Sequence, residues 1–464
     1  MTAAAEPDAS NGRHPLSLAV NGRERLLERL LVPFPVAQAH GSRGRSGPRS
    51  VAVVGLGYVG LPTALALHGR VPIVTGVDID RERLRAIEGG DVDLCDGDRR
   101  RLAAATGDQG FRLTTAVAAV ADHDAVIVCV PTPVDERRDP DLTALRAACD
   151  DVVAHARSGQ TIILTSTSFV GTTRELLIEP FRRRGMTVGT DVHVAFSPER
   201  IDPGNPDHVQ RETPRVVGGA TPECASQAAQ VVRQLTDSVF LVTSPEAAEL
   251  TKLYENIFRA VSLALANEVA DICGFLGLDP IEVTLAAGTK PYGFLGALPG
   301  PGVGGHCIPC DPHYLLWQLR RVGRTAPMIE QAMRGIDDRP DRVVRRAAEV
   351  LAEDGLAVAG AKVIVVGAGY KAGVRDLRES PALPILAGLA ARGADIHYHD
   401  PLLPVITLPG GRVLVGERDP AAVDWDLVLI HVVHPGVDIG WAATCRRVLD
   451  ATYLFDAAAH RRVV

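Results

Sequence analysis

Short apolar runs alternate with helix-like segments along most of this chain. Runs such as VAVVGLG, DAVIVCVPTP and TIILTST are rich in β-branched residues, and stretches with helical spacing separate them. Strands that alternate with helices form a parallel sheet with helices on both faces. The same alternation begins again near residue 361 with AKVIVVGAGYKAG, followed by ADIHYHDP, WDLVLIHVVHP and TYLFDAAA. The pattern predicts an α/β protein with two Rossmann-like, doubly wound domains.

The longest helical pattern lies between the two series, from Ser244 to about Leu278. Ser244 suits an N-cap, and Pro245 suits the first helical position. At ~1.5 Å per residue the helix would be about 45 Å long, which is more than one small domain can bury. We therefore expect a long central helix that joins the two domains and forms a dimer seam.

Composition narrows the class of protein and its partners. With 464 residues, of which 46% are hydrophobic, the chain is long enough for two or three domains with apolar cores. A net charge of -7 argues against nucleic acid, which is bound by clustered basic side chains. The eight cysteines are scattered, and we find neither an apolar run of membrane-spanning length nor a signal-peptide pattern. We expect a cytoplasmic protein with no membrane partner and no disulfide framework.

A glycine motif follows the first apolar run. Gly55, Gly57 and Gly60 form G-x-G-x-x-G between the run VAVV and a helical segment, the arrangement that holds a dinucleotide pyrophosphate. Asp78 ends the next apolar run, at the spacing expected for an acid that binds the adenosine ribose. The alternative is an ordinary glycine turn with a surface aspartate. Because Asp78 would repel a 2′-phosphate, we expect the cofactor to be NAD rather than NADP.

The segment GPGVGGHCIPCDPHYL, which begins at Gly300, carries the main candidate chemistry. Metal binding through its histidines and cysteines is one interpretation, but no second Cys/His pair stands nearby at structural-zinc spacing. A redox pair normally opens a helix beside a strand, whereas this pair follows a glycine-rich loop. Asp311 suits an N-cap with Pro312 at the first helical position. Cys307 precedes that helix, whose positive end favours the thiolate, so we interpret it as a nucleophile and predict no metal site.

Two further candidates have plain structural alternatives. Lys252 and Asn256 lie four residues apart on one face of the expected central helix, where a surface ion pair with Glu249 is the simpler account of the lysine. Thr132 ends the run DAVIVCVPTP at the edge of the sheet where ligands bind. A capping role in a proline-rich turn explains this threonine as well.

Taken together, these motifs resemble the UDP-glucose/GDP-mannose dehydrogenase family of nucleotide-sugar 6-dehydrogenases. The resemblance extends over about residues 50–460 through GLGYVGLP, VPTPVD, STSFVGTT, SPER, ELTKLYEN, GPGVGGHCIPCDP and YKAGVRDLRES. It implies a homodimer or higher homo-oligomer and three domains: an NAD-binding Rossmann-like domain (49–243), a central helical dimerisation domain with the cysteine loop (244–340) and a C-terminal UDP-sugar-binding domain (341–464). Residues 1–48 are not matched by the family, and their Gly/Ser/Arg-rich run HGSRGRSGPRS predicts a flexible N-terminal extension.

The resemblance also implies the chemistry, an NAD-dependent double oxidation of the sugar C6 hydroxyl to a carboxylate. Cys307 matches the catalytic cysteine, which forms a thiohemiacetal with the C6 aldehyde and then a thioester that water hydrolyses. Lys252, Asn256 and Asp311 match residues that steady the oxyanion and the water involved in proton transfer.

The remaining site residues follow from the same matches. Glu199 matches an active-site carboxylate, and Ser168 stands where relatives have a threonine that helps to hold the water. Residues expected to contact the cofactor are Gly55, Gly57, Tyr58, Val59, Gly60, Asp78, Arg83, Thr132, Thr167 and Arg378. Residues expected to contact the UDP-sugar are Glu199, Arg200, Lys252, Asn256, Tyr292, Phe294, Gly304 and Lys371.

The chain departs from the family pattern within TSTSFVGTT, where Thr165 replaces a glutamate and Val170 a proline. The first change touches an expected cofactor contact. The segments TKPYGF, PVDERRDPDL and SPERIDPGN are most similar to UDP-N-acetylglucosamine 6-dehydrogenases, so we expect that substrate, used to make a surface polysaccharide or glycan precursor. UDP-glucose and UDP-N-acetylmannosamine are the alternatives. A sensor that binds NAD and a nucleotide sugar with weak turnover is the non-enzymatic alternative.

Overall fold

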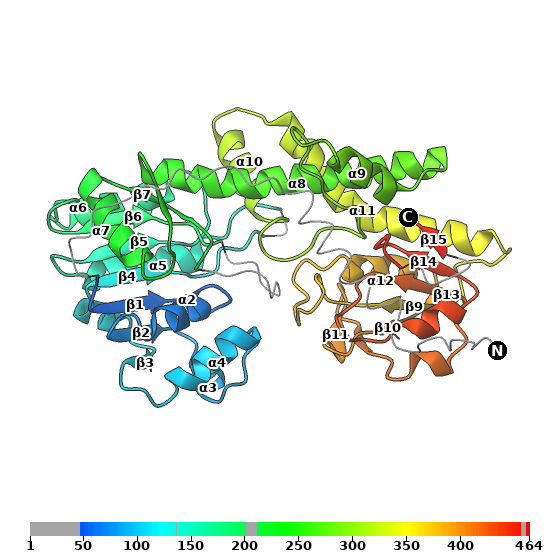
Figure 1. The fold of residues 1–464 in the computed structure, drawn as a ribbon, viewed down its shortest axis with the longest axis horizontal. Coiled ribbons are helices and arrows are strands. Elements are labelled where there is room, and N and C mark those ends of the chain that lie inside the picture. Colours follow the sequence, from blue (N-terminus) through cyan, green and yellow to red (C-terminus); the bar gives the residue numbers. More distant parts are fainter. Residues whose placement is uncertain (1–46, 136, 201–210, 456–460) are drawn as a thin grey trace, which may run out of the picture. The chain divides into compact units, whose positions relative to one another are not determined.

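The computed structural model of the protein describes residues 47–135, 137–200, 211–455 and 461–464. The flexible extension expected at 1–48 lies outside these residues apart from its last two positions. The described residues divide into two compact units, one with 47–261 and His306–Gln331, the other with Ser262–Gly305 and 332–464. Each unit is built around its own sheet, coloured blue to green in the first and yellow to red in the second (Figure 1).

The first unit holds an eight-stranded sheet in the order β3-β2-β1-β4-β5-β6-β7-β8. Its strands are β1 (Ser50–Val54), β2 (Ile73–Val77), β3 (Phe111–Thr114), β4 (Ala125–Val128), β5 (Thr161–Leu164), β6 (His193–Phe196), β7 (Arg215–Gly219) and β8 (Val239–Val242). Neighbours are parallel except β6 and β7, so the expected parallel arrangement is wrong at that pair. An antiparallel neighbour needs no crossover helix, and the proline-rich sequence SPERIDPGNPDHVQRETP joins these strands.

Side chains alternate between the two faces of this sheet, and each face has its own apolar core. Val54 and Val128 belong to one core, whereas their neighbours Val53 and Ile127 belong to the other. The first core is completed by α5 (Thr143–His155), the π-helical turn η2 (Arg174–Ile178), α6 (Glu179–Arg183), α8 (Pro245–Leu276) and α10 (Asp311–Arg321). The second is completed by α2 (Gly60–Leu67), α3 (Arg81–Glu88), α4 (Asp96–Ala105) and α7 (Pro222–Val232). Helices on both faces confirm the doubly wound prediction.

The second unit holds a five-stranded parallel sheet in the order β10-β9-β13-β14-β15. Its strands are β9 (Lys362–Val366), β10 (Asp395–His399), β13 (Leu427–Ile430), β14 (Val448–Asp450) and β15 (Arg461–Val463). An antiparallel hairpin of β11 (Val405–Thr407) and β12 (Val413–Val415) stands apart from it. Residues of α11 (Pro327–Ala352) and α12 (Ala382–Ala391) pack on one face. This sheet confirms the second Rossmann-like domain.

The predicted last strand, TYLFDAAA, is wrong. The strand in this part of the chain is β14, which ends at Asp450. The buried Asp450 carboxylate accepts hydrogen bonds from the amides of Thr452 and Phe455, both at 2.8 Å. Tyr453 takes a positive φ of 63°, so the chain turns where the prediction continued a strand. A side chain that binds nearby amides offers the backbone an alternative to the ladder. Residues 456–459 of the run lie outside the described residues.

Helix α8, Pro245–Leu276, confirms the predicted long helix. Ser244 Oγ accepts a hydrogen bond from the Ala247 amide at 3.2 Å, as an N-cap should. Residues of this one helix belong to both compact units, because the division falls between Val261 and Ser262. The division expected from the sequence, with boundaries at 243/244 and 340/341, stays a prediction. Within the described ranges, no helix is long and apolar enough to cross a membrane.

Glu249 of α8 is buried, which corrects one expectation. Its side chain is 1% exposed and accepts hydrogen bonds from the amides of Gly171 (2.6 Å) and Thr173 (2.8 Å) and from the Thr173 hydroxyl (2.7 Å). Burial raises the pKa of this carboxyl in spite of those hydrogen bonds. The surface ion pair with Lys252 is therefore wrong, because the carboxylate anchors α8 to the loop after β5.

Candidate active site

The first glycine turn leaves room for a ligand at its centre. Gly55 has a φ of +88°, and a Cβ atom added there would lie 2.8 Å from the Cys129 carbonyl oxygen. A Cβ atom on Gly60, the first residue of α2, would lie 1.7 Å from the Gly55 carbonyl oxygen. At Gly57 the same atom would meet nothing within 4 Å. The outer glycines allow the close packing of strand and helix, and the space at Gly57 fits the pyrophosphate of NAD.

Asp78 lies one residue beyond β2 and is fixed beside this turn. Its Oδ2 accepts a hydrogen bond from the Leu56 amide at 2.7 Å, and its Oδ1 accepts one from the Asp80 amide at 3.0 Å. Arg83 Nε donates to the Leu56 carbonyl at 2.9 Å. A carboxylate has about four acceptor sites, so Asp78 keeps acceptor capacity for ribose hydroxyls.

The other residues expected to contact the cofactor in this unit differ in exposure. Tyr58 is 40% exposed and Val59 is half-buried, both beside the glycine turn. Thr132 is buried, and its carbonyl accepts a hydrogen bond from the Tyr314 hydroxyl at 2.7 Å. Thr167, half-buried, follows β5. Their roles in NAD binding stay predictions.

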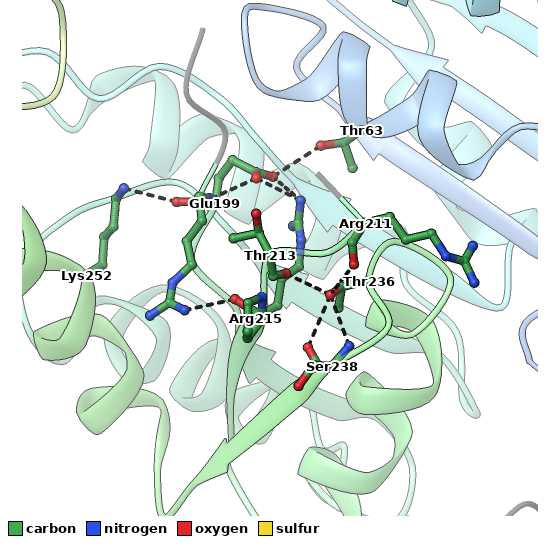
Figure 2. Close-up of polar contacts among 10 residues, drawn as sticks. Thr63, Glu199, Arg211, Thr213, Arg215, Thr236, Ser238 and Lys252 are labelled. Carbon is green, nitrogen blue, oxygen red and sulfur yellow. Dashed lines mark hydrogen bonds and ion pairs between the residues drawn. The ribbon is translucent and has the colours of Figure 1, made fainter. Parts of the chain in front are cut away.

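Glu199 directs its side chain and its main chain to different partners (Figure 2). The buried carboxylate forms an ion pair with Arg215, with both oxygens within 2.8 Å of Nη2. Thr63 of α2 donates to the same carboxylate at 3.5 Å. The Glu199 carbonyl, by contrast, accepts a hydrogen bond from Lys252 Nζ at 3.0 Å. In this arrangement it is the backbone of Glu199, and not its carboxylate, that holds the expected active-site lysine.

The half-buried Arg200 guanidinium has two partners. Its Nη1 donates to the Pro214 carbonyl at 2.8 Å, and its Nη2 forms an ion pair with Glu255 of α8. The guanidinium therefore braces the same segment that carries Glu199. Its expected contact with the UDP-sugar stays a prediction.

Asp311 and Asn256 meet in a buried contact between α10 and α8. Asn256 Nδ2 donates to Asp311 Oδ2, and the two residues are 8% and 4% exposed. Burial raises the pKa of the Asp311 carboxyl to about 6, although the positive charge of Lys252 and the Asn256 hydrogen bond favour ionisation. Asp311 is the first residue of α10 and Cys310 is its N-cap, so the predicted capping role is wrong. The carboxylate is turned toward Asn256 instead of the helix amides.

Ser168 lies in the loop that Glu249 anchors, and it is 2% exposed. Among the residues that the structure describes, no group accepts or donates a hydrogen bond at its hydroxyl. A buried hydroxyl in that state is suited to a bound water. In the same loop, the Val170 amide donates to Gln318 Oε1 at 3.1 Å and its carbonyl accepts from Gln318 Nε2 at 2.7 Å. Proline at this position could not make the first of these bonds.

The two cysteines of the loop have different surroundings. Cys307 is exposed, and its carbonyl accepts hydrogen bonds from the amides of Cys310 (3.2 Å) and Asp311 (2.8 Å), which join it to the start of α10. Cys310 is 3% exposed. None of the eight cysteines, all of which lie in the described ranges, forms a disulfide. His313 is buried, which lowers its pKa to about 4, and so it is neutral at physiological pH.

Five of the predicted site residues belong to the second unit. Tyr292 is 69% exposed, with Lys290 Nζ 4.8 Å from its ring centre, and Phe294 is half-buried. Gly304 lies against Tyr370 and Glu379, which are the sequence neighbours of Lys371 and Arg378, and the Arg378 guanidinium binds the carboxylate of Asp376 at 2.7 Å. Their contacts with substrate and cofactor stay predictions.

Sequence reasoning passed over several residues that hold the site together. Arg215 is the clearest, because it is a charged residue at the start of the fully buried strand RVVGG. A buried arginine needs a paired acid, and this signal could have pointed to Glu199. Glu249, Thr63 and Gln318 carry no such signal, because their partners lie far away in the sequence.

Comparison with known proteins identifies all three parts of the chain. The NAD binding domain of the UDP-glucose/GDP-mannose dehydrogenase family matches residues 49–236, its central domain matches 246–335, and its UDP binding domain matches 364–460. NDP-N-acetyl-D-galactosaminuronic acid dehydrogenase from Ralstonia solanacearum is 34% identical over 403 residues, which are 83% of this chain and 91% of that protein.

Two further relatives agree with this match. UDP-N-acetyl-D-mannosamine dehydrogenase from Escherichia coli (strain K12) is 34% identical over 349 residues, 72% of this chain and 81% of that protein. The solved structure of UDP-D-ManNAc dehydrogenase from Pyrococcus horikoshii has a TM-score of 0.81 at 29% identity and covers 89% of this chain and 99% of that chain.

The glycine turn, the sheets and these matches together define an NAD-dependent dehydrogenase that acts on a nucleotide sugar. The chain belongs to the UDP-glucose/GDP-mannose dehydrogenase family. The resemblance noted in the sequence, the fold class and NAD as the cofactor are confirmed. The UDP binding domain supports a UDP-sugar as the substrate.

The raised pKa of Asp311 predicts opposite effects of Asp311→Asn on stability and activity. Burial raises the pKa of this carboxyl from its ordinary value of about 3.8 to about 6 in the folded protein, so ionisation costs stability. That cost is absent below about pH 4 and complete above about pH 6. We expect the variant to unfold at a higher temperature than the wild type at about pH 8, with the gain shrinking toward about pH 4. Its kcat/KM should fall by roughly a hundredfold or more if the carboxylate transfers a proton.

Asp96→Asn is the matched control, because Asp96 is also the first residue of a helix, α4, but is exposed. Thermal unfolding at several pH values and steady-state kinetics measure both effects. The control should show neither the pH-dependent gain nor the kinetic loss. An Asp311→Asn protein with no gain in stability at the higher pH would contradict the burial cost assigned to this carboxylate.

Proposed function

We propose that this protein oxidises the C6 hydroxyl of a UDP-linked N-acetylhexosamine to a carboxylate, with two NAD consumed for each sugar. The observation that carries the proposal is the buried meeting of Asn256 and Asp311, with Lys252 one helical turn away and Cys307 joined to the start of the same α10. These residues belong to the unit that contains the NAD turn.

The chemistry assigns a separate task to each side chain. NAD, when bound, accepts a hydride in each of the two oxidations. The Cys307 thiolate adds to the C6 aldehyde to give a thiohemiacetal, which after the second oxidation is a thioester. Water then hydrolyses the thioester, releasing the carboxylate product and the thiol. The C6 carbon stays bonded to the Cys307 sulfur from the thiohemiacetal until that hydrolysis.

The surrounding residues supply charge and proton transfer. The Lys252 ammonium, held by the Glu199 carbonyl, stabilises negative charge on the substrate oxygen. Asp311, with a pKa of about 6, is suited to accept a proton near neutral pH. Asn256 orients that carboxylate. Ser168 would help to hold the water, since its hydroxyl is buried and has no partner among the described residues.

The substrate class rests on motifs and on relatives. The sequence motifs favour UDP-N-acetylglucosamine, whereas the relatives reported above are named for N-acetylmannosamine and N-acetylgalactosaminuronic acid. All of these sugars carry the 2-acetamido group. UDP-N-acetylhexosamine is therefore the class that we propose, with the epimer to be decided by measurement.

The direct test is a panel of UDP-N-acetylglucosamine, UDP-N-acetylmannosamine, UDP-N-acetylgalactosamine and UDP-glucose, with NADH followed by absorbance and the acid quantified. We expect one N-acetylhexosamine to give the highest kcat/KM, with two NADH per acid. One NADH per sugar would mean that oxidation stops at the aldehyde. Preference for UDP-glucose would contradict the substrate class. NAD and UDP-sugar binding without turnover would favour the sensor alternative.

The two cysteines of the loop provide a matched pair of variants. Cys307→Ala removes the group that holds the aldehyde, so uronic acid formation should fall by roughly a thousandfold or more, with NAD affinity retained. Cys310→Ala alters a buried side chain of the same loop and should cost about tenfold or less. Steady-state kinetics and NAD titration measure both variants. Similar large losses in the two variants would contradict Cys307 as the sole nucleophile.

We also propose that the protein is a homodimer through α8. Large apolar side chains of this helix are exposed at intervals of four or seven residues: Leu250, Tyr254, Phe258, Leu265, Ile272 and Leu276. A stripe of this kind on a single chain is typical of a surface that a second copy covers. The mass of the intact protein in solution, measured by light scattering, should be at least twice that of one chain, and a monomer would contradict this assignment.

A further inference from the structure

The second unit contains a turn that resembles the first glycine turn. The residues at the positions of Asp78 and Thr132 are Asp400 and His434. Gly367, after β9, has a φ of +83°, and a Cβ atom there would lie 2.1 Å from the Val432 carbonyl, as Gly55 meets Cys129. Asp400 directly follows β10, as Asp78 directly follows β2. His434 is the fourth residue after β13, which ends at Ile430, as Thr132 is the fourth after β4, which ends at Val128.

In this copy, Asp400 and His434 bind each other instead of facing a ligand. Asp400 is 3% exposed, and its Oδ2 lies 3.0 Å from His434 Nε2. The same oxygen accepts hydrogen bonds from the amides of Ala368 (2.7 Å) and Gly369 (3.1 Å), and Oδ1 accepts one from Leu402 at 2.9 Å. The interaction with His434 and these amide bonds lower the pKa of the Asp400 carboxyl in spite of its burial.

The geometry fixes the tautomer of His434. The Gly373 amide donates a hydrogen bond to His434 Nδ1 at 3.0 Å, so this nitrogen carries no proton. The proton of the neutral ring is therefore on Nε2, from which it is donated to Asp400. The Asp400–His434 pair thus binds the segment 368–373 at both ends, with Asp400 at 368–369 and His434 at 373.

Tyr370 of the segment 368–373 packs against Gly304 and Gly305, which precede Cys307 in the chain. A Cβ atom added to Gly304 would lie 2.6 Å from Tyr370 Cβ, and one added to Gly305 would lie 2.8 Å from the Tyr370 ring. The Gly305 amide also donates to the Arg378 carbonyl at 2.9 Å. Gly305 has a φ of +85° and stands two residues before Cys307 in the chain. Glycine is required at both positions because Tyr370 lies directly over them.

We propose that the buried Asp400–His434 pair is a positioning element for the nucleophile. By clamping segment 368–373 it holds Tyr370 over Gly304 and Gly305, and thereby fixes where the chain enters the loop with Cys307. In this second turn, the aspartate therefore helps to position the catalytic loop. The inference rests on the proposed role of Cys307, and its test includes a measurement that needs no UDP-sugar.

Two variants of the full-length protein each remove one of the two hydrogen bonds of the His434 ring. In His434→Asn the side-chain oxygen can still accept from Gly373 but the donor to Asp400 is lost. In His434→Gln the side-chain nitrogen can still donate to Asp400. His397→Gln is the matched control, because His397 of β10 also pairs with an acid, Glu417, at 2.8 Å, and lies outside the clamped segment.

The first readout is the rate at which iodoacetamide alkylates Cys307, quantified on its peptide by mass spectrometry, with the exposed Cys95 as an internal reference. We expect both His434 variants to change the Cys307 rate by about threefold or more, with Cys95 and the His397→Gln protein unchanged. With the active UDP-sugar, kcat should fall by roughly tenfold to a hundredfold while the KM for NAD is unchanged.

Folded His434 variants with unchanged Cys307 alkylation and unchanged kcat would overturn the proposal. Equal losses in His397→Gln would also overturn it, because they would indicate general destabilisation. If the His434 variants fail to fold, Tyr370→Ala tests the same route and should shift Cys307 alkylation in a folded protein. If the wild type oxidises no UDP-sugar, the proposed function fails, while the alkylation rates still decide the positioning role.

Discussion

One face of helix α8 makes three polar contacts, and the proposed active site depends on them. Glu249, Lys252 and Asn256 follow one another at intervals of three and four residues, so they lie on the same side of the helix. Each reaches a different segment: the loop after β5, the Glu199 carbonyl and Asp311 of α10. Because the three contacts share one helix, the loop after β5, the main chain at Glu199 and the start of α10 have fixed positions relative to one another.

Two of the carboxyl groups in these contacts, Glu249 and Asp311, are buried away from water. Burial raises the pKa of both Glu249 and Asp311. For Glu249, three hydrogen bonds from the loop offset part of the cost. For Asp311 the shift brings the titration close to neutral pH, where a carboxylate transfers protons most effectively. Glu199 and Arg215 are also buried, but their opposite charges form an ion pair, so each compensates the burial of the other.

The two glycine turns of this chain show how one local device can support two tasks. Both turns have a glycine with positive φ after the first strand and an aspartate after the second. In the first, Asp78 is half-buried and keeps acceptor capacity beside open space at Gly57. In the second, Asp400 is buried against His434 and the turn supports the segment that covers Gly304 and Gly305. The sequence patterns VAVVGLG and VIVVGAG do not distinguish the two turns. The difference is that His434 binds the Asp400 carboxylate, whereas no histidine binds that of Asp78 among the described residues.

The sequence by itself determined the alternation of strands and helices, the long helix α8, the dinucleotide turn and the family, because each depends on local periodicity or on contiguous motifs. The tertiary structure alone decided which way Glu199 directs its carboxylate, that Glu249 is buried and that Asp311 binds Asn256 instead of capping α10. It also decided the antiparallel pairing of β6 with β7 and the end of β14 at Asp450. The physical reason is common to all of these: the partner of each group stands far away in the chain or competes with a local alternative, and only packing selects between them.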